Sequence, residues 1–444
     1  MSAVSPSSEA ESVSPEGVSA LDTLPRDVAT TGERTYWIET LGCPKNQVDS
    51  DKLEGSLIAD GLAPAPSAEA ADLVVVNTCA FVEDARQESI DTILDFSDAR
   101  NPDAELVVTG CLAERYGSEL ADALPEVDAV VGFGVPVTLG SKPIAPSFDL
   151  LNMPRPPSSA PWAYVKIAEG CDRNCGFCAI PSFRGPQRSR SIESIRAEVD
   201  ELGVREVVLV AQDLAAYGRD QGQGERQIVP LVRAVAEQAD WVRLLYLYPS
   251  DLTDELIDTM CSIGMPYFDL SLQHVSRPLL RRMRRWGDGD RFVERIEAIR
   301  AREPDAAFRT NFIVGYPGET EQDHDRLLDF VGQTQLDWCG FFSYSEEAGT
   351  YAADLDGTVP PALMAERLAE LRELQDRITE EKRDEMLGRT VEVLVDEPGT
   401  ARSHREAPEI DGIIGVPVGL PVGEFATVHI VGAAGPDLTA EHGV

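Results

Sequence analysis

The chain has 444 residues, of which 43% are hydrophobic and 26% charged, and its formal net charge at pH 7 is −38. This length and composition predict a globular protein of roughly two to four domains, and no apolar run is long enough to span a bilayer. Proteins that bind nucleic-acid phosphates are usually basic, so we do not expect direct nucleic-acid binding. The negative charge favours a basic partner. Adaptation to high salt, or a proteome that is acidic in general, would give the same charge.

The first 33 residues differ in amino-acid composition from the rest of the chain. Residues 1–33 are rich in Ser, Ala, Glu and Pro without apolar periodicity, which predicts a disordered tail. They lack the basic and apolar regions of a signal peptide. The eight cysteines therefore point to the reducing cytoplasm, and to metal binding or catalysis in place of disulfides. We expect a cytoplasmic protein with no membrane association.

An α/β domain is predicted over residues 34–140. Helix-like stretches near Asp49–Asp60 and Asp84–Asp98 alternate with short buried strands at Tyr36–Thr40, Leu73–Asn77 and Leu106–Thr109. This alternation is typical of a small parallel sheet covered by helices.

A cysteine follows each of these three strands, at Cys43, Cys79 and Cys111. Ligands of open parallel sheets bind at the carboxyl ends of the strands, so we expect the three thiols to converge. Gly42 and Gly110 would let the backbone approach a bulky ligand. Three ordinary buried thiols are the alternative, because Cys is often buried. Three cysteines at three strand ends favour an auxiliary iron–sulfur cluster with one iron left open.

A Pro-rich linker is predicted over residues 141–160, followed by a second α/β domain over residues 161–386. Helix-like stretches, such as Ile192–Leu202 and Arg291–Arg302, alternate there with six strands expected at Trp162–Ala168, Glu206–Ala211, Val242–Leu247, Tyr267–Leu272, Phe308–Val314 and Trp338–Ser343. Six β/α units predict a barrel or a partial barrel, whose working face is the rim at the carboxyl ends of its strands.

The loop after the first barrel strand carries Cys171, Cys175 and Cys178 with the spacing Cx3Cx2C. Three thiolates this close together can hold three corners of a cubane iron–sulfur cluster. The fourth iron is then open to bind and reduce a small molecule. A structural zinc would need a fourth nearby Cys or His, and the nearest candidates, Cys261 and His274, lie in no such motif. We therefore predict a substrate-binding cluster.

A helix-like stretch at Pro361–Leu387 leads to a small acidic module over residues 387–444. Its strand-like pieces, Val391–Val395, Gly412–Val416 and Phe425–Ile430, predict a five-stranded β-barrel. Its acidity is unfavourable for RNA and suits a basic protein.

From about Thr35 onward the chain resembles the radical S-adenosylmethionine (SAM) superfamily, and within it the methylthiotransferases. Phe177 before the last cysteine completes the superfamily signature, and the three spread cysteines and a final module similar to a TRAM domain narrow the resemblance. It implies an N-terminal parallel α/β sandwich, a central partial (β/α)6 TIM-like radical SAM barrel and a C-terminal TRAM-like β-barrel.

Two branches of that family compete: one modifies an adenosine in tRNA, the other an aspartate in a small-subunit ribosomal protein. Cys43-Pro44-Lys45-Asn46 resembles the second branch, since the first typically has Gln-Met after this cysteine. Further segments typical of the second branch are Val210–Asp213, Leu272–His274 and Ala407–Gly412; Gln47 and Tyr217–Gly218 depart from the common pattern. A cluster carrier without enzymatic activity is a third hypothesis.

The resemblance implies a radical mechanism with two 4Fe–4S clusters. SAM would bind the open iron of the Cys171–Cys178 cluster, and its reductive cleavage would give a radical that takes hydrogen from the β-carbon of an aspartate in ribosomal protein twelve of the small subunit. The auxiliary cluster would present a sulfur, methylated by another SAM, for transfer. An electron donor and a sulfur source, sulfide or persulfide, are implied. Whether the substrate is free or assembled in the subunit stays open.

Other site residues are weaker predictions. Phe177 in the cluster loop and Gly315 at a strand end are expected to approach the cofactor. Gln212, Asp213, Gln273 and Arg309 also lie near strand ends and are candidates for SAM contacts, with structural hydrogen bonds as the alternative. Three arginines after the cluster loop either contact a ligand or are solvated: Arg184, Arg188 and Arg190. We expect the arginine-rich run Arg277–Arg285 to be a solvated helix face. We expect Cys261 and Cys339 to be packed thiols.

Overall fold

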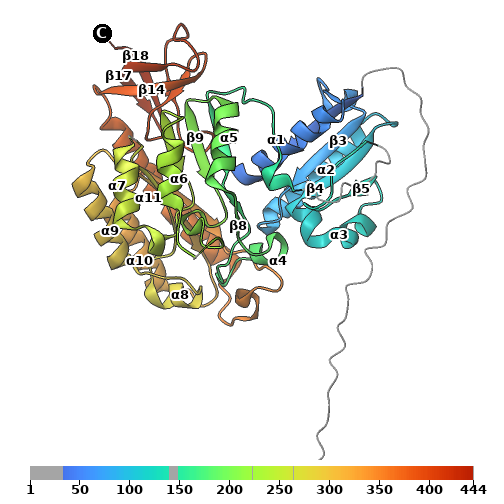
Figure 1. Cartoon of the computed structure of the whole chain (residues 1–444). Helices are drawn as coiled ribbons and strands as arrows, with labels where there is room; N and C mark the ends of the chain where they lie inside the picture. The colour runs from blue at the N-terminus through green and yellow to red at the C-terminus, as the bar shows by residue number, and fades with distance from the viewer. Residues whose placement is uncertain (1–33, 140–148, 223, 264, 444) are drawn as a thin grey trace, which may run out of the picture.

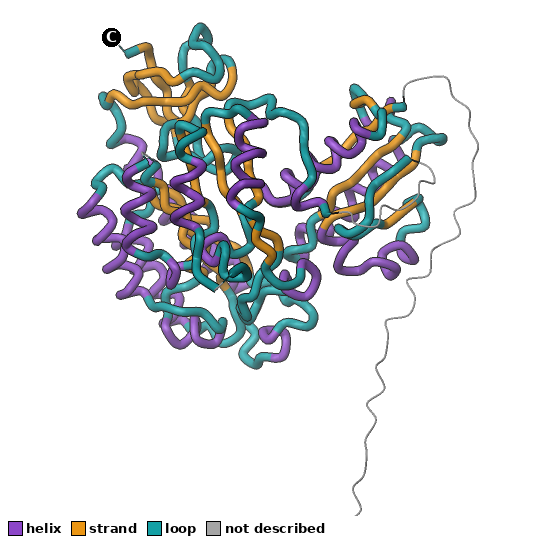
Figure 2. Tube along the Cα trace, in the orientation of Figure 1, coloured by secondary structure: helices purple, strands orange, loops and turns teal. Residues whose placement is uncertain are grey.

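The computed structural model describes residues 34–139, 149–222, 224–263 and 265–443. The predicted tail at residues 1–33 and the first part of the predicted linker lie outside these ranges. The described chain forms an α/β sheet, a larger partial barrel beside it, and a small β-barrel at the far end of the larger one (Figures 1 and 2). Among these residues, no helix has the length and apolar character needed to cross a membrane.

The N-terminal sheet is parallel throughout and has the strand order β2-β1-β3-β4-β5. Its strands are β1 (Thr35–Thr40), β2 (Ala63–Pro64), β3 (Leu73–Thr78), β4 (Glu105–Gly110) and β5 (Ala129–Val130). Because β1, β3 and β4 are direct neighbours, their carboxyl ends lie at one edge of the sheet.

Helices cover both faces of this sheet, as alternate side chains of a buried strand require. They are α1 (Pro44–Ala59), α2 (Glu83–Ala99) and α3 (Cys111–Ala123), with the short η1 (Ala68–Ala70). Leu73 and Val75 pack with Leu57 of α1, whereas Val74 and Val76 face the cluster formed by α2 and α3. α1 begins five residues earlier than its predicted core because Pro44 occupies the first turn, where a missing N–H costs nothing.

The central unit contains six strands in two three-stranded parallel sheets, β10-β9-β6 and β11-β12-β13, which meet at a bridge between Leu247 and Leu270. Among the described residues β6 and β13 do not pair, so the barrel is open, and the predicted partial (β/α)6 barrel is confirmed. The strands are β6 (Trp162–Lys166), β9 (Glu206–Val210), β10 (Trp241–Leu244), β11 (Tyr267–Gln273), β12 (Ala307–Val314) and β13 (Trp338–Ser343).

Helices pack around the outside of this arc (Figure 1). The helices of this unit are α4 (Ile180–Arg184), α5 (Ile192–Leu202), α6 (Ile228–Val235), α7 (Asp254–Ser262), α8 (Arg277–Arg282), α9 (Gly289–Arg302), α10 (Glu321–Thr334) and α11 (Pro361–Asp384). Short elements complete it: η2 (Leu150–Asn152), β7 (Ala168–Glu169), β8 (Arg188–Ser189), η3 (Leu214–Ala216), η4 (Pro249–Asp251) and η5 (Tyr351–Asp354).

The C-terminal unit is a closed five-stranded barrel in the order β14-β15-β16-β18-β17, as predicted. Its strands are β14 (Thr390–Glu397), β15 (Thr400–Arg402), β16 (Ile414–Gly415), β17 (Phe425–Ala434) and β18 (Asp437–His442). Glu206, the first residue of β9, contacts Arg402 of this unit at 2.8 Å, and Tyr267, the first of β11, donates to Asp411 Oδ2. The small barrel therefore covers the amino ends of the central strands and leaves their carboxyl ends uncovered.

The described part of the predicted linker packs tightly against α1. Leu150 and Leu151 are buried, and Lys52 Nζ donates to the carbonyl oxygens of Leu151 and Met153 at 2.9 Å each. This stretch therefore fixes the N-terminal unit to the barrel side of the molecule.

Candidate functional site

The three cysteines of the N-terminal unit lie at neighbouring strand ends. Cys43 caps α1 after β1, Cys79 follows β3, and Cys111 is the first residue of α3 after β4. A Cβ atom on Gly42 would lie 2.8 Å from Cys79 Sγ, so only glycine leaves room between these two loops. Gly42 also has a φ of +96°, which favours glycine.

Asn46, in the first turn of α1, ties the three loops together. Its side-chain Nδ2 donates to the carbonyl oxygens of Leu41 at 2.9 Å and Thr78 at 3.0 Å. Its Oδ1 lies 3.6 Å from Cys111 Sγ. One amide thus sets the spacing of all three cysteine-bearing loops.

The surroundings of these three thiols give them different pKa values. Burial, together with the neighbouring Cys43 and Cys111, raises the pKa of Cys79 to about 12. Burial also raises the pKa of Cys111, although Arg184 opposes it. For Cys43 burial acts in the same sense, but the charges of Lys45 and Arg184 outweigh it and the pKa is lowered. Cys43 is therefore the thiol most ready to ionise, as metal binding requires.

The second triplet lies in the loop between β7 and α4. Gly176, between Cys175 and Cys178, donates its N–H to Met283 O at 2.8 Å and accepts from the Ala352 N–H at 2.8 Å. The Arg173 N–H lies 3.4 Å from Cys171 Sγ. The loop is therefore held from several sides around its cysteines.

Two arginines flank this loop. Arg285 Nη1 donates to Cys175 Sγ at 3.2 Å, and its guanidinium stacks 4.3 Å from the ring centroid of Tyr248. Arg173 stacks on the same ring at 3.9 Å and pairs with Asp213 at 2.5 Å. Arg285 thus departs from the solvated helix face expected for the arginine run, because it turns inward from the end of α8.

Both triplets suit a multi-iron cluster. Burial raises the pKa of Cys171 to about 11 and that of Cys178 to about 12, so metal binding to these two thiols releases their protons. Within the described ranges, no three or more His, Cys, Asp or Glu side chains are placed to hold a metal ion. Each triplet offers three cysteine sulfurs, one for each of three irons of a cubane, whereas a structural zinc takes four Cys or His ligands, so the donor sets suit such a cluster better than a lone zinc.

The predicted SAM-contact residues fall into different surroundings. Gln212 donates to Glu169 Oε1 at 2.7 Å, while its own Oε1 is buried without a hydrogen-bond partner among the described residues. Asp213 is buried against Arg173. Gln273 ends β11 with a φ of +67°, an unusual backbone for a non-glycine residue. These residues surround the carboxyl ends of β9 and β11.

Phe177 and Gly315 lie on the barrel side of the second triplet. Phe177 is partly buried against the barrel core. Gly315 follows β12 with a φ of +83°, and its N–H donates to the Glu319 carboxylate. A Cβ on Gly315 would collide with the Met364 side chain, so this position is close-packed.

Arg309 does not lie at a carboxyl strand end, so its predicted contact with SAM is wrong. It lies in the first half of β12, near the amino end of the strand, and its guanidinium contacts Asp269 at 3.6 Å and Asp411 at 3.4 Å. The prediction noted only that Arg309 is close to an end of its strand. Ligands of parallel sheets bind at the carboxyl ends of the strands, whereas Arg309 lies near the amino end. Arg309 instead joins the central barrel to the C-terminal unit.

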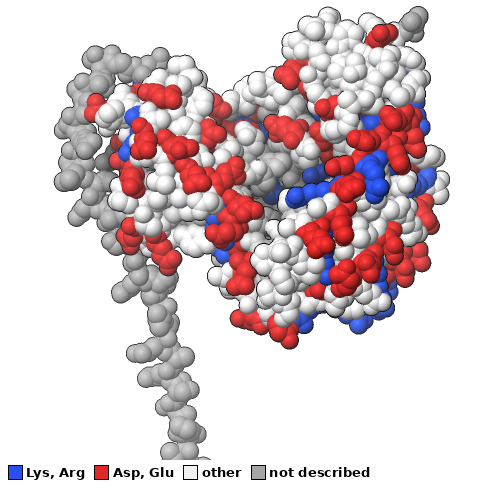
Figure 3. All heavy atoms as spheres, turned by 180° about the vertical axis from the view of Figure 1, so that it is seen from behind, with Lys and Arg blue, Asp and Glu red and all other residues white. Residues whose placement is uncertain are grey.

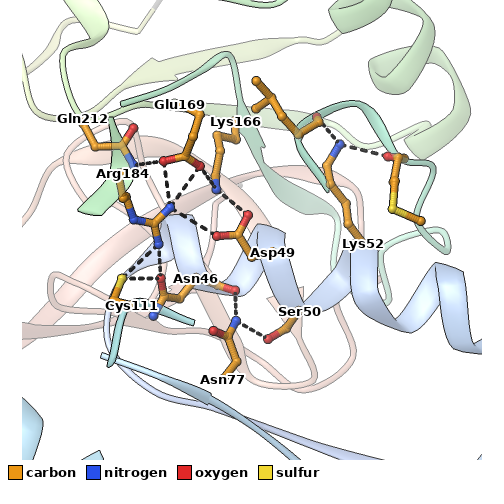
Figure 4. Close-up of polar contacts among 12 residues, drawn as sticks. Asn46, Asp49, Ser50, Lys52, Asn77, Cys111, Lys166, Glu169, Arg184 and Gln212 are labelled. Carbon is orange, nitrogen blue, oxygen red and sulfur yellow. Dashed lines mark hydrogen bonds and ion pairs between the residues drawn. The ribbon is translucent and has the colours of Figure 1, made fainter. Parts of the chain in front are cut away.

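Arg184 of α4 links Cys111 of the first triplet to Glu169, which precedes the second cysteine loop (Figure 4). Its Nη2 lies 3.0 Å from Cys111 Sγ and 2.8 Å from Asn46 Oδ1. Its Nη1 lies 2.8 Å from Glu169 Oε1, at the start of the second cysteine loop. A single buried guanidinium therefore contacts both cysteine-bearing units.

Lys166 completes this network. Its Nζ pairs with Asp49 of α1 and lies 2.8 Å from Glu169 Oε2. Burial alone would raise the pKa of Glu169, but Arg184 and Lys166 outweigh it and hold that pKa well below its usual range. Sequence reasoning left Arg184 undecided and missed Lys166, Glu169 and Asp49. A lysine inside a buried strand was the available signal, since such a charge needs a partner.

Three family models match successive parts of this chain. Residues 35–132 match the family described as uncharacterized protein family UPF0004, residues 165–331 the radical SAM superfamily and residues 387–442 the TRAM domain. Among solved structures, the radical SAM methyltransferase TsrM from Kitasatospora setae aligns at 14% identity with a TM-score of 0.47, covering 72% of this chain and 74% of that one.

Curated relatives match nearly the whole chain. The ribosomal protein uS12 methylthiotransferase RimO of Moorella thermoacetica is 43% identical over 414 residues, covering 88% of this chain and 95% of the relative. The protein of the same name from Aquifex aeolicus is 41% identical, covering 90% and 95%, and that of Kineococcus radiotolerans is 39% identical, covering 92% and 97%. The chain therefore belongs to the RimO family, and it is a radical SAM methylthiotransferase that uses an iron–sulfur cluster and SAM.

Proposed function

We propose that this enzyme methylthiolates the β-carbon of an aspartate in ribosomal protein uS12, with two 4Fe–4S clusters. Cys43, Cys79 and Cys111 hold the auxiliary cluster, and the Cx3Cx2C loop holds the cluster that binds SAM. The observation that carries the proposal is the pair of cysteine triplets, each of which would ligate three irons of a four-iron cluster. The substrate follows from the name shared by the relatives.

We assign a separate task to each predicted domain of the chain. Residues 34–140 carry the auxiliary cluster, residues 161–386 bind SAM and receive the target, and residues 387–444 close the amino end of the barrel, with residues 141–160 as the connection. When bound, the two clusters supply the electron that cleaves SAM and the sulfur that is transferred. Arg184 and Arg285 donate hydrogen bonds to cysteine sulfurs at the two sites, which stabilises thiolates.

The charge of the chain supports a basic protein substrate. The chain has 77 Asp and Glu residues against 39 Lys and Arg. Figure 3 shows acidic side chains spread over the visible face of both large units. Such a surface attracts a basic ribosomal protein and repels the phosphates of a tRNA.

A side-by-side anaerobic assay tests the proposal. The reconstituted, reduced enzyme is given SAM and sulfide, together with a peptide of the uS12 loop and a tRNA anticodon stem-loop, and both are read by mass spectrometry. A methylthio mass gain on the peptide aspartate is expected. A gain on the tRNA alone would overturn the assigned substrate, and SAM-independent transfer of clusters to an acceptor protein would overturn the assigned reaction.

A further inference from the structure

Lys45 lies beside a cysteine of the first triplet and forms no ion pair with another described residue. It lies two residues after Cys43, in the first turn of α1, and its Nζ sits 3.8 Å from the ring centroid of Tyr246. No carboxylate oxygen of a described residue comes within the 4.0 Å salt-bridge distance of that nitrogen. The other lysines that the structure describes each face a carboxylate: Lys52, Lys166 and Lys382.

Tyr246 is held where it supports this ammonium. It follows β10 with a φ of +66°, a strained backbone for an aromatic residue. Its N–H donates to Asp269 Oδ2 at 2.9 Å, which fixes the strained turn to β11. Asp269 is also 3.6 Å from Arg309. Asp269, on which the Lys45 charge also acts, is thus engaged by two other groups, and the aromatic ring of Tyr246 faces Lys45.

A chain of contacts joins the surroundings of Lys45 to the second cysteine triplet. Leu247, the residue after Tyr246, accepts a hydrogen bond at its carbonyl from the Ser271 N–H at 2.8 Å. The Ser271 carbonyl accepts in turn from Arg285, which also contacts Cys175 Sγ at 3.2 Å. A substrate that reaches both triplets therefore passes near the positive charge of Lys45.

We propose that Lys45 binds the side-chain carboxylate of the target aspartate; this inference rests on the proposed function. The carboxylate carbon is bonded directly to the β-carbon, so an ion pair at the carboxylate orients the C–H bond that reacts. Lys45 is half-buried and its ammonium is positive on a chain of strong net negative charge, so it attracts a substrate anion. Lys45 is therefore a substrate-binding and specificity-determining residue.

The test compares two uS12 loop peptides that differ only by aspartate or asparagine at the target position. With the holoenzyme, peptide affinity is measured by fluorescence anisotropy with SAM bound, and kcat/KM by mass spectrometry. We expect the wild-type enzyme to favour the aspartate peptide in affinity by about ten- to hundredfold, the range of one charge-assisted hydrogen bond. Lys45→Gln should reduce this preference to less than about threefold, whereas Lys45→Arg should retain most of it.

Controls separate this role from a structural one. Lys382→Gln, on α11 and paired with Asp337, should keep the wild-type preference. Iron content and 5′-deoxyadenosine formation without peptide are measured in every variant, and peptide discrimination is compared per loaded enzyme, because the Lys45 charge also acts on Cys43. Wild-type discrimination in Lys45→Gln, or loss of iron or of SAM affinity in both Lys45 variants, would overturn the inference. Failure of the wild-type enzyme to modify the aspartate peptide would instead overturn the proposed function.

Discussion

At the scale of residues, two arginines lie beside cysteine sulfurs. Arg184 donates to Cys111 and Arg285 to Cys175, and each guanidinium is fixed by a second contact. Arginine suits such positions because its planar fork donates several hydrogen bonds at once and stays charged when buried. The sulfur environment is therefore set by side chains outside the cysteine motifs.

The two triplets should fail differently when one cysteine is removed. Cys171→Ala should abolish cleavage of SAM, because the second cluster loses a ligand. Cys79→Ala should retain part of that cleavage and abolish transfer of the methylthio group. Measurement of 5′-deoxyadenosine and of peptide mass in one reaction checks both, with Cys261→Ala as the control. Methylthiolation by Cys79→Ala would contradict the role of the first triplet.

His274 gives a prediction for stability at acid pH. It is fully buried, accepts the Ser276 N–H at Nδ1, and has no partner at Nε2 among the described residues. Burial lowers its pKa from 6.5 to about 4. The unfolded chain binds the proton first as pH falls, so the stability from the neutral ring is present above pH 6.5 and is lost between pH 6.5 and 4.

Between pH 7 and 5 this loss amounts to about 2 kcal/mol. His274→Asn keeps an acceptor for Ser276 but does not titrate, so its unfolding free energy should fall less over the same range. Urea unfolding at both pH values checks this, with the exposed His429→Asn as the matched variant. Equal acid losses in wild type and His274→Asn would contradict the prediction.

At the scale of elements, the junction between β4 and α3 sets the position of Cys111. Gly110 has a φ of +91°, and a Cβ there would lie 2.6 Å from backbone atoms of Thr78. Gly110→Ala should therefore destabilise the protein by more than about 2 kcal/mol and lower its iron content, because Cys111 must move.

The control is another glycine in a helix. A Cβ on Gly332, within α10, would meet no described atom within 4 Å beyond the adjoining backbone of its own helix, so Gly332→Ala should be neutral or stabilising by up to about 1 kcal/mol. Urea unfolding of the metal-free proteins and iron determination after reconstitution compare the two. A Gly110→Ala variant as stable as Gly332→Ala would show that this junction can relax.

Elements were the most predictable level from sequence. The first strand, the helix at Ile192–Leu202 and the last barrel strand follow directly from apolar patterning and capping signals. The positions of Arg184, Lys166 and Arg309 did not follow, because their partners come from distant segments. Apolar periodicity shows that a residue is buried, but a buried charge is explained only by the partner that tertiary packing brings to it.

At the scale of the whole molecule, buried ion pairs join the N-terminal unit to the barrel. Arg184 connects Glu169 to Asn46 and Cys111, and Glu347, after β13, lies 2.7 Å from Arg115 of α3. Removing one partner of a buried pair leaves an uncompensated charge. The relative placement of the two triplets therefore depends on these contacts.

Arg184→Gln should loosen this contact and lower the unfolding free energy by about 3–5 kcal/mol. Hydrogen exchange should increase at the starts of α1 and α3, while Arg188→Gln, whose side chain is 58% exposed, should change neither measurement. Exchange that is unchanged in Arg184→Gln would show that the remaining contacts suffice to hold the units together.

The closed C-terminal barrel has a consequence for how this enzyme can evolve. Glu206 of the central unit contacts both Arg243 of the same unit and Arg402 of the C-terminal unit. The charges at this boundary are therefore compensated only when both units are present. A gene fusion that exchanges only residues 387–444 for those of another protein would leave Glu206 and Arg243 beside side chains that do not compensate their charges. Inheritance should therefore keep the two units together, and a viable chimaera would have to transfer Glu206 and Arg243 with the module.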